Sequence, residues 1–234
     1  MRPRRRQPVL LDDEPPYRFP DPASHDSEGL VAFGGDLAPG RLLAAYSAGI
    51  FPWFNEETVP LWWSPDPRAV LDPASLHVSR SLARTIRRGR FTLTWDRAFA
   101  DVMRGCGDRP DSGTWITDEM FGAYCELHRL GHAHSLEVWV DGALAAGTYG
   151  VHVGGLFAAE SMFYRVTDMS KVALVALVHT LFRAGIELLD VQFMTEHLET
   201  MGVYPIPRAD YLARLAAVRD KPVMLGGLTP VLGG

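Results

Sequence analysis

The fold is decided by the stretch from His134 to Gln192, which reads HSLEVWV-DG-ALAAGTYGVHV-GG-LFAAESMFY-RVTDM-SKVALVALVHTLFRA-G-IELLDVQ. It begins with three strand-like runs, His134–Val140, Leu144–Val153 and Leu156–Tyr164. The Asp-Gly and Gly-Gly pairs between the runs are strong signals for tight hairpin turns. The pattern therefore predicts an antiparallel meander of three strands.

A helix and a further strand follow the meander. We expect Ser170 to cap a helix that runs to Ala184, with Gly185 at its end. Residues 186–192 then form a strand. This pattern establishes an α+β domain. By analogy of element order, the domain is GNAT-like, an acyltransferase fold in which two strands splay apart and leave a cleft for an acyl donor.

Shorter elements are expected on both sides of this unit. Before the meander they are a helix capped by Ser79 and ended by Gly89, a strand over 91–95, and a helix from Thr117 to Leu130. After residue 192 they are helices over 195–201 and 208–217.

The segment Ser64-Pro-Asp-Pro marks a domain boundary, because two prolines forbid a continuous element. Before it, residues 30–36 resemble a short strand or loop, and residues 41–48 a short helix. The first residues are rich in Pro, Arg and Asp and poor in large apolar side chains. We therefore expect a disordered N-terminus over 1–16, a small N-terminal α/β domain over 17–64, and a GNAT-like catalytic domain over 65–234.

Composition narrows the class of protein. Among the 234 residues, 47% are hydrophobic and 22% are charged, as is ordinary for a soluble globular protein. The net charge of −5 argues against a uniformly basic surface but allows a local basic patch. Cys106 and Cys125 have no framework spacing, no run reaches the roughly 20 apolar residues of a membrane span, and the N-terminus lacks an apolar signal core. We expect a cytoplasmic protein.

The residues before the long helix bear on the acyl donor. A coenzyme-A-dependent enzyme of this fold would hold the pyrophosphate there with the backbone N–H groups of a Gly-rich loop. The segment 165–171, RVTDMSK, has no glycine, and Asp168 would repel a phosphate. We therefore expect a donor other than acyl-coenzyme A, and no cofactor.

Several motifs together resemble one family, the leucyl/phenylalanyl-tRNA–protein transferases of bacteria. They are GLVAFGGDL (29–37), AYSAGIFPWF (45–54), WWSPDPR (62–68), GTWIT (113–117), HSLEVW (134–139), ESMF (160–163), SK (170–171) and DVQ (190–192). The resemblance covers about residues 17–215. It implies a small N-terminal domain packed on a GNAT-like domain. It also implies transfer of Leu, Phe or Met from aminoacyl-tRNA to the α-amine of proteins that begin with Lys or Arg, which marks those proteins for degradation.

Asp190 and Gln192 are the candidate catalytic residues. Their i, i+2 spacing places both side chains on one face of an otherwise apolar strand. A buried carboxylate needs a partner, and Gln192 is the nearest candidate. The resemblance implies that Asp190 polarises Gln192, whose carbonyl receives the proton side of the incoming amine. The alternative is a pair that only joins the strand to a neighbour.

Glu160 is the candidate acceptor-binding residue. It lies in the apolar run LFAAESMF, where a charge is costly unless a cation meets it. The resemblance implies that this cation is the N-terminal end of the acceptor. The alternative is an internal salt bridge, for example with Lys171.

The resemblance also implies a pocket for the Leu or Phe side chain of the donor. Its expected lining residues are Phe157, Met162, Leu174, Leu177 and Leu189, for which ordinary core packing is the alternative. Two positions depart from the family pattern, Ala159 in place of Gly and Val191 in place of Cys. Both lie beside the expected pocket and bear on side-chain preference.

Contacts with tRNA are expected at a ridge of arginines and at two tryptophans. One face of the predicted helix carries Arg80, Arg84 and Arg87, followed by Arg88. Arginines grouped in this way are suited to contact the phosphates of the tRNA. The alternative is a solvated charged face. Trp53 and Trp115 could stack the terminal adenine, or belong to the core.

Other classes of site and function are weaker. His128, His132 and His134 do not make a metal site, because the first two straddle a helix end and no Cys or carboxylate completes a ligand set. No Gly-x-Ser-x-Gly elbow of a serine hydrolase occurs. An acyl-coenzyme A acyltransferase and a non-catalytic adaptor for tRNA or peptides remain as alternatives. The missing loop disfavours the first, and the polar set at 160, 190 and 192 disfavours the second.

Overall fold

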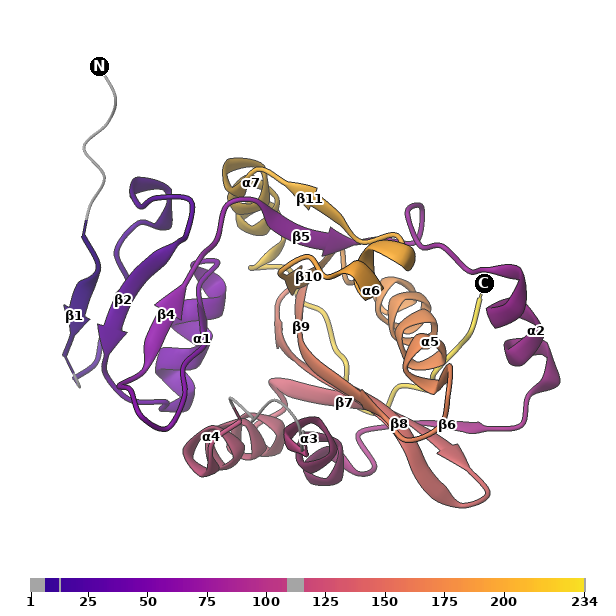
Figure 1. The fold of residues 1–234 in the computed structure, drawn as a ribbon. Coiled ribbons are helices and arrows are strands. Elements are labelled where there is room, and N and C mark those ends of the chain that lie inside the picture. Colours follow the sequence, from indigo (N-terminus) through magenta and orange to yellow (C-terminus); the bar gives the residue numbers. More distant parts are fainter. Residues whose placement is uncertain (1–6, 13, 109–115, 234) are drawn as a thin grey trace.

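The computed structural model describes residues 7–12, 14–108 and 116–233 (Figure 1). The elements before residue 64 are β1 (Val9–Leu11), the 3-10 helix η1 (Pro22–Ser24), β2 (Leu30–Gly34), α1 (Pro39–Ser47), β3 (Phe51–Pro52) and β4 (Leu61–Trp63). They contain a four-stranded sheet in the order β1-β2-β4-β3.

The elements after residue 64 build a larger sheet. They are β5 (Arg68–Leu71), α2 (Arg80–Arg88), β6 (Thr92–Trp95), α3 (Phe99–Gly107), α4 (Asp118–Arg129), β7 (Ala133–Val140), β8 (Ala143–Val153), β9 (Leu156–Tyr164), α5 (Met169–Arg183), β10 (Leu188–Gln192), α6 (Glu196–Thr200), β11 (Tyr204–Ile206) and α7 (Arg208–Val218). The sheet order is β11-β5-β10-β9-β8-β7-β6. The expected α+β fold is confirmed, and the order of meander, helix and strand is GNAT-like.

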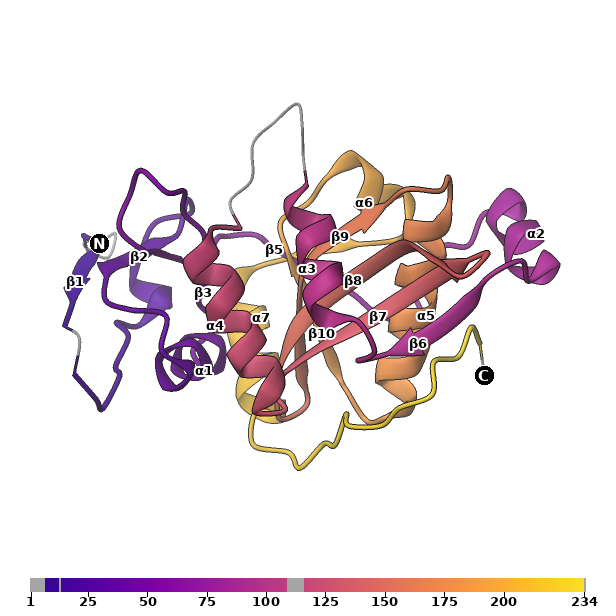
Figure 2. The same ribbon diagram turned by 90° about the horizontal axis from the view of Figure 1, so that it is seen from below.

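Helices cover both faces of the larger sheet (Figures 1 and 2). Helix α5 packs its apolar side chains on one face, where they form a core with residues of β7, β9 and β10. Helices α3 and α4 cover the other face and share a second core with α1 and the small sheet. The same apolar cluster thus joins the N-terminal elements to the larger sheet.

Local sequence signals account for several element ends. The Ser79 hydroxyl accepts a hydrogen bond from Leu82 N and caps α2, which ends at the left-handed Gly89. Thr117 caps α4 in the same way. Asp141 and Gly142 both have positive φ, of 51° and 78°, as a two-residue hairpin turn between β7 and β8 requires. These predictions are confirmed.

Two local predictions are wrong. Ser170 is not the N-cap of α5, because the chain enters the helix through Asp168 in the left-handed region, with φ of 67°. The expected disorder over 1–16 is contradicted at Val9–Leu11, which pairs in parallel with β2 and buries Leu11. The rest of that segment includes residues 1–6 and 13, which lie outside the described residues.

Helix α3 is an element that the sequence pattern does not predict. Its N-cap, Ala98, has no side chain that can accept a hydrogen bond. The cap is supplied from β7, because the Glu137 carboxylate accepts hydrogen bonds from Arg97 N (3.4 Å) and Ala98 N (3.3 Å). A cap that comes from 40 residues away leaves no local signal.

The cleft begins where β9 and β10 stop pairing. The two strands run parallel and pair only at Leu188–Asp190 with Leu156–Ala158. Immediately beyond, β9 has a bulge, since Tyr149 of β8 pairs with Ser161 and Gly150 with Ala159. Glu160 is therefore the extra residue of the bulge.

One further finding concerns membranes. None of the described helices combines the length and the apolar character needed to cross a bilayer.

The bulge requires a glycine at position 150. A Cβ atom there would lie 2.3 Å from the Ala158 carbonyl oxygen and 2.4 Å from the Phe157 ring. We predict that Gly150→Ala lowers the free energy of unfolding by about 1–3 kcal/mol, as overpacking does. Gly122→Ala is the matched control, because Gly122 lies on α4 with nothing within 4 Å of an added Cβ. It should raise stability by about 0.5–1 kcal/mol. Urea unfolding measures both effects. If the two variants are equally stable, β8 and β9 can move apart at the bulge without cost, and the prediction is wrong.

Candidate active site

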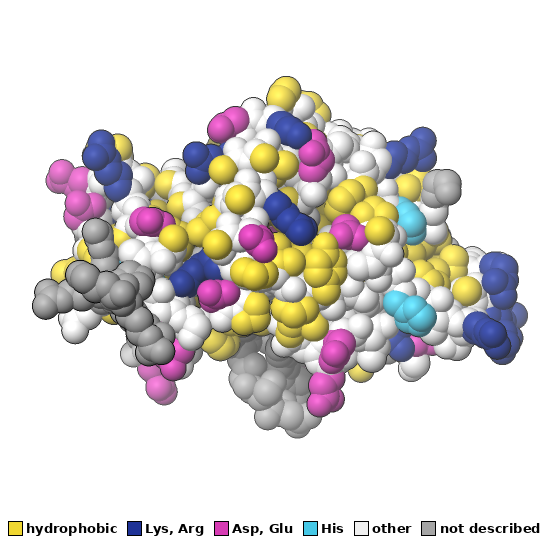
Figure 3. Space-filling view, turned by 90° about the horizontal axis from the view of Figure 1, so that it is seen from above, with side chains coloured by type: hydrophobic (Ala, Val, Ile, Leu, Met, Phe, Trp, Pro, Cys, Tyr) yellow, Lys and Arg dark blue, Asp and Glu magenta, His cyan; other side chains and the backbone are white. Residues whose placement is uncertain are grey.

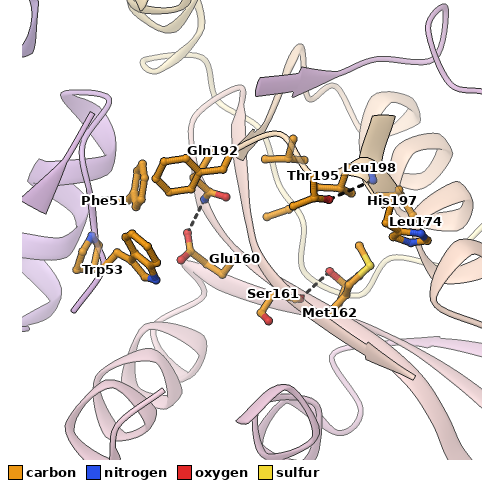
Figure 4. Close-up of a pocket in the computed structure, with 15 residues that line it drawn as sticks. Phe51, Trp53, Glu160, Ser161, Met162, Leu174, Gln192, Thr195, His197 and Leu198 are labelled. Carbon is orange, nitrogen blue, oxygen red and sulfur yellow. Dashed lines mark hydrogen bonds between the residues drawn. The ribbon is translucent and has the colours of Figure 1, made fainter. Parts of the chain in front are cut away.

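A cavity of about 430 Å³ opens between the diverging ends of β9 and β10 (Figure 4). One side of it is polar and aromatic, with Glu160, Gln192, Phe51 and Trp53. The opposite side is largely apolar and is formed by residues of β9, α5 and α6. Both the proposed N-terminal domain and the larger sheet therefore supply its walls.

Glu160 and Gln192 face each other across the gap between the two strands. Gln192 Nε2 donates a hydrogen bond to Glu160 Oε1 at 3.0 Å (Figure 4). Each residue lies at a bulge of its own strand, because the pairing of β10 with β5 also shifts between Asp190 and Gln192. The bulges turn two side chains of neighbouring strands toward one point.

The backbone of Gln192 is unusual. Its φ of +58° lies in the left-handed region, which a non-glycine residue rarely adopts. On either side of Gln192 in the chain, Phe193 N donates a hydrogen bond to Val191 O at 2.7 Å. The Gln192 N–H itself donates to Asp190 Oδ1 at 2.9 Å. The regular alternation expected for Asp190 and Gln192 is thus broken, and the two residues meet through the backbone N–H of Gln192.

Asp190 is buried as expected, but its main partner is Arg68 and not the Gln192 side chain. Arg68 Nε and Nη2 donate to the two carboxylate oxygens at 2.8 and 2.6 Å. Both side chains are almost fully buried, at 1% and 0% exposed. Burial by itself lowers the pKa of the Arg68 guanidinium, but the Asp190 carboxylate raises it above its ordinary value. This ion pair follows from no local pattern, although Arg68 ends the motif WWSPDPR and begins an apolar strand.

The hydrogen bonds that Glu160 accepts from the described residues come from neutral side chains. Besides the bond from Gln192, Glu160 accepts a hydrogen bond from Tyr46 Oη at 2.8 Å, and Tyr46 lies 2.6 Å from Tyr124 Oη. Burial raises the pKa of the Glu160 carboxyl to about 8, although the hydrogen bond from Tyr46 lowers it. Lys171, the alternative internal partner, pairs with Asp168 at 3.1 Å. The free cavity therefore holds a mostly protonated Glu160 near neutral pH.

The apolar side of the cavity differs in part from the expected one. Met162 and Leu174 line it, but Phe157, Leu177 and Leu189 are fully buried in the core between α5 and the sheet. Thr148, Ala159, Val191 and Leu198 line it as well. The expectation fails because the divergence of β9 and β10, which no local pattern predicts, decides which apolar residues meet open space. The two departures from the family pattern, Ala159 and Val191, both face the cavity.

Three aromatic rings stand at the mouth of the cavity. Phe193 packs against Phe51 and Trp53 with ring centroids 5.6 and 5.5 Å apart. Trp53 is 45% exposed, and Phe193 is 38% exposed. Apolar side chains also gather on the middle of the face shown in Figure 3. Trp115 lies outside the described residues.

The arginine ridge lies on α2, at the far end of the molecule from the small sheet (Figures 1 and 3). Arg80, Arg84, Arg87 and Arg88 are all exposed. Among the described residues none of them forms an ion pair within 4 Å, whereas Arg41, Arg104 and Arg129 do. The charges of the four α2 arginines are therefore available to an external anion.

The N-terminus of α5 carries a carboxylate where a coenzyme-A-binding loop would lie. Asp168 is the N-cap, and its side chain makes no cap hydrogen bond but accepts one from Lys171 Nζ at 3.1 Å.

Two of the histidines considered as metal ligands lie beside the same carboxylate. His134 Nδ1 lies 2.6 Å from Asp96 Oδ2, and His128, which stacks on Phe99, has its Nδ1 3.8 Å from Asp96 Oδ1. Within the described ranges, no group of three or more His, Cys, Asp or Glu side chains is placed to hold a metal ion.

Comparison with known proteins gives a consistent result. A family model described as "Leucyl/phenylalanyl-tRNA protein transferase" matches residues 70–216, and the model of its N-terminal domain matches residues 35–66. A leucyl/phenylalanyl-tRNA–protein transferase of Anaeromyxobacter sp. (strain Fw109-5) is 57% identical over 211 residues, which cover 89% of this chain and 90% of the relative. One from Yersinia enterocolitica is 49% identical over 209 residues, which cover 88% and 89%. Among solved structures, a GCN5-related N-acetyltransferase from Kribbella flavida aligns with 71% of this chain and 60% of its own, at 12% identity and a TM-score of 0.38.

The raised pKa of Glu160 predicts a pH-dependent stability difference. Between its ordinary value of 4.5 and about 8, the folded state holds a proton that the unfolded chain has released. The contribution of Glu160 to stability therefore falls as the pH rises through this range. We predict that Glu160→Gln, which stays neutral, gains melting temperature relative to the wild type as the pH rises from 5 to 8. The exposed Glu56→Gln is the control and should show no such trend. A constant difference for Glu160→Gln would contradict the raised pKa.

Proposed function

This chain belongs to the leucyl/phenylalanyl-tRNA–protein transferase family and is an aminoacyltransferase, and we propose that it transfers Leu, Phe or Met to proteins that begin with Lys or Arg. The observation that carries the proposal is a single cavity with an apolar side for a donor side chain and Glu160 and Gln192 opposite. Residues 65–234 are the proposed catalytic domain, and residues 17–64 are the proposed small domain that completes the cavity mouth.

The proposed donor site is the apolar side of the cavity. Met162, Leu174 and Leu198 offer apolar contacts for the side chain of Leu, Phe or Met. Trp53, exposed at the mouth, is the proposed stacking platform for the terminal adenine. The exposed arginines of α2 then contact phosphates of the tRNA body. Aminoacyl-tRNA is made and used in the cytoplasm, so the proposed reaction belongs there.

The proposed reaction joins the two substrates directly. The nitrogen of the acceptor α-amine attacks the ester carbonyl carbon, and the C–N bond forms as the bond to the ribose oxygen breaks. The amine proton ends on that oxygen. Gln192 donates its Nε2 hydrogen to Glu160, an orientation in which its carbonyl Oε1 can accept a hydrogen bond from the amine. Holding the amine beside the ester lowers the barrier, because it makes a bimolecular step effectively unimolecular.

Glu160 is the proposed contact for the cationic end of the acceptor. In the free cavity its carboxyl is mostly protonated near pH 7. A cation beside it favours the charged form, so acceptor binding releases a proton. The transferred residue then serves as a degradation signal of the N-end rule.

Transfer of label is the direct test of this function. Purified protein, tRNA charged with labelled Leu, and a reporter with N-terminal Arg should yield labelled reporter. The same reporter with N-terminal Gln should take up much less. If label stays on the tRNA with every reporter and donor, the proposed function is wrong.

The role of Glu160 predicts a pH dependence that separates the two reporters. Deprotonation of Glu160 favours the cationic acceptor, so the preference for the Arg reporter over the Gln reporter should rise from pH 6 to 8.5. The α-amine titrates in both reporters, so their ratio isolates the effect of Glu160. In Glu160→Gln the preference should fall about tenfold or more, as expected for a lost charge-assisted contact. Equal losses toward both reporters would assign Glu160 a purely structural role.

The α2 ridge predicts a salt-dependent effect on the donor. Replacing Arg80, Arg84 and Arg87 with Ala should raise KM for aminoacyl-tRNA at low salt. It should also reduce the slope of log affinity against log salt by up to about 3. Melting temperature should change little, because exposed charges contribute little to folding. Ala at three exposed arginines away from α2, Arg97, Arg129 and Arg214, is the matched control. Similar tRNA affinity of the two triple variants would make the ridge an ordinary solvated face.

A further inference from the structure

Arg68 is almost fully buried beside the cavity. Its guanidinium lies between the rings of Phe51 and Tyr211, with its central carbon 4.7 and 4.4 Å from the ring centroids. Its edge donates twice to Asp190 and, through Nη1, once to Gly49 O at 3.1 Å. The guanidinium is therefore held both by aromatic contacts and by hydrogen bonds from its edge.

The Asp190 carboxylate accepts four hydrogen bonds, and none of them comes from the Gln192 side chain. Oδ1 accepts from Arg68 Nε and from Gln192 N, and Oδ2 accepts from Arg68 Nη2 and from Tyr211 Oη at 2.9 Å. Four donors occupy the two carboxylate oxygens. The one contact that leads to the cavity is the hydrogen bond from the backbone N–H of Gln192.

That contact holds Gln192 in a conformation it would otherwise leave. A φ of +58° is unfavourable for a residue with a side chain and persists only where the surroundings determine it. The same conformation turns Nε2 toward Glu160. The orientation of the Gln192 amide therefore depends on Asp190, and the position of Asp190 depends on Arg68.

Arg68 also reaches the opposite wall of the cavity. Gly49 O and the Phe51 ring belong to the segment that follows α1, and Phe51 lines the cavity. One side chain thus connects the wall supplied by the small domain with the wall supplied by β10.

We propose that Arg68 is the positioning residue of the transfer reaction, and that it acts through Asp190 on the Gln192 amide. Asp190 in this arrangement is an anchor for the Gln192 backbone, and its charge is matched by the guanidinium. This role rests on the proposed function only in so far as Gln192 orients the acceptor amine.

Arg68→Lys tests the role, because lysine keeps the charge but not the planar fork or the stacking. Arg41→Lys is the matched control. Arg41 is also fully buried, pairs with Asp36 at 2.9 Å, donates to a carbonyl and stacks on Tyr17, but lies away from the cavity. We expect Arg68→Lys to lose at least as much melting temperature as Arg41→Lys, because Asp190 is fully buried whereas the Asp36 side chain is 41% exposed. Arg68→Lys alone should lose about tenfold or more in kcat with KM for aminoacyl-tRNA nearly unchanged.

Tyr211→Phe is a milder second variant, which removes one hydroxyl donor from Asp190. It should fold and lose kcat to a smaller extent than Arg68→Lys. If both variants keep the kcat of Arg41→Lys, Arg68 has no role beyond stability and the proposal is overturned.

A double variant separates positioning from general support. If Arg68 acts through Gln192, then Arg68→Lys should cost nothing further in a Gln192→Ala background, because residues that act as a unit are not additive. Multiplied losses in the double variant would overturn the proposal.

A crystal structure of Arg68→Lys supplies a readout that needs no activity. We expect Gln192 to leave the left-handed region and its hydrogen bond to Glu160 to be lost. An unchanged Gln192 would refute the positioning role. If the wild type transfers no label, the proposed function fails, and this structure still decides the role of Arg68.

Discussion

Two parallel strands that pair over three residues and then separate create the space on which the site depends. Strands β9 and β10 share hydrogen bonds only from Leu188 to Asp190. Where the pairing stops, each strand has a bulge, and the bulges turn Glu160 and Gln192 into the gap. If β9 and β10 had continued to pair as in a regular sheet, backbone hydrogen bonds would have joined them and left no cavity between them. The bulges thus convert a break in the sheet into a cavity with two polar groups at a defined distance.

The electrostatics of the cavity follow from how each buried carboxyl is satisfied. Asp190 faces a guanidinium and carries its charge in a matched pair, which avoids the large cost of an isolated buried ion. Glu160 has hydroxyl and amide partners instead, and its raised pKa leaves it mostly neutral near pH 7. The Glu160 carboxyl can therefore respond to a cation that enters the cavity.

The small sheet contributes to the site through contacts that cross between the two sheets. The Arg208 guanidinium, at the start of α7, donates to the carbonyl oxygens of His25, Asp26 and Ser64. Tyr46 of α1 reaches Glu160, and Arg68 reaches Gly49. These contacts fix the segment that carries Phe51 and Trp53 over the cavity.

Residue patterns along the chain are enough to predict the elements whose signals are local. Hairpin turns, the caps at Ser79 and Thr117, and the order of meander, helix and strand depend on residues a few positions apart. The patterns also point to residues 160, 190 and 192, because polar side chains in apolar strands are conspicuous. The partners of these residues, in contrast, depend on how distant segments fold together. Arg68 meets Asp190 across 122 residues, Tyr46 meets Glu160 across 114, and the divergence of β9 from β10 leaves Met162 and Leu174 in the cavity while Leu177 and Leu189 stay in the core. Such pairings depend on strand register and on packing between distant segments, which the spacing of residues along one strand or helix cannot encode.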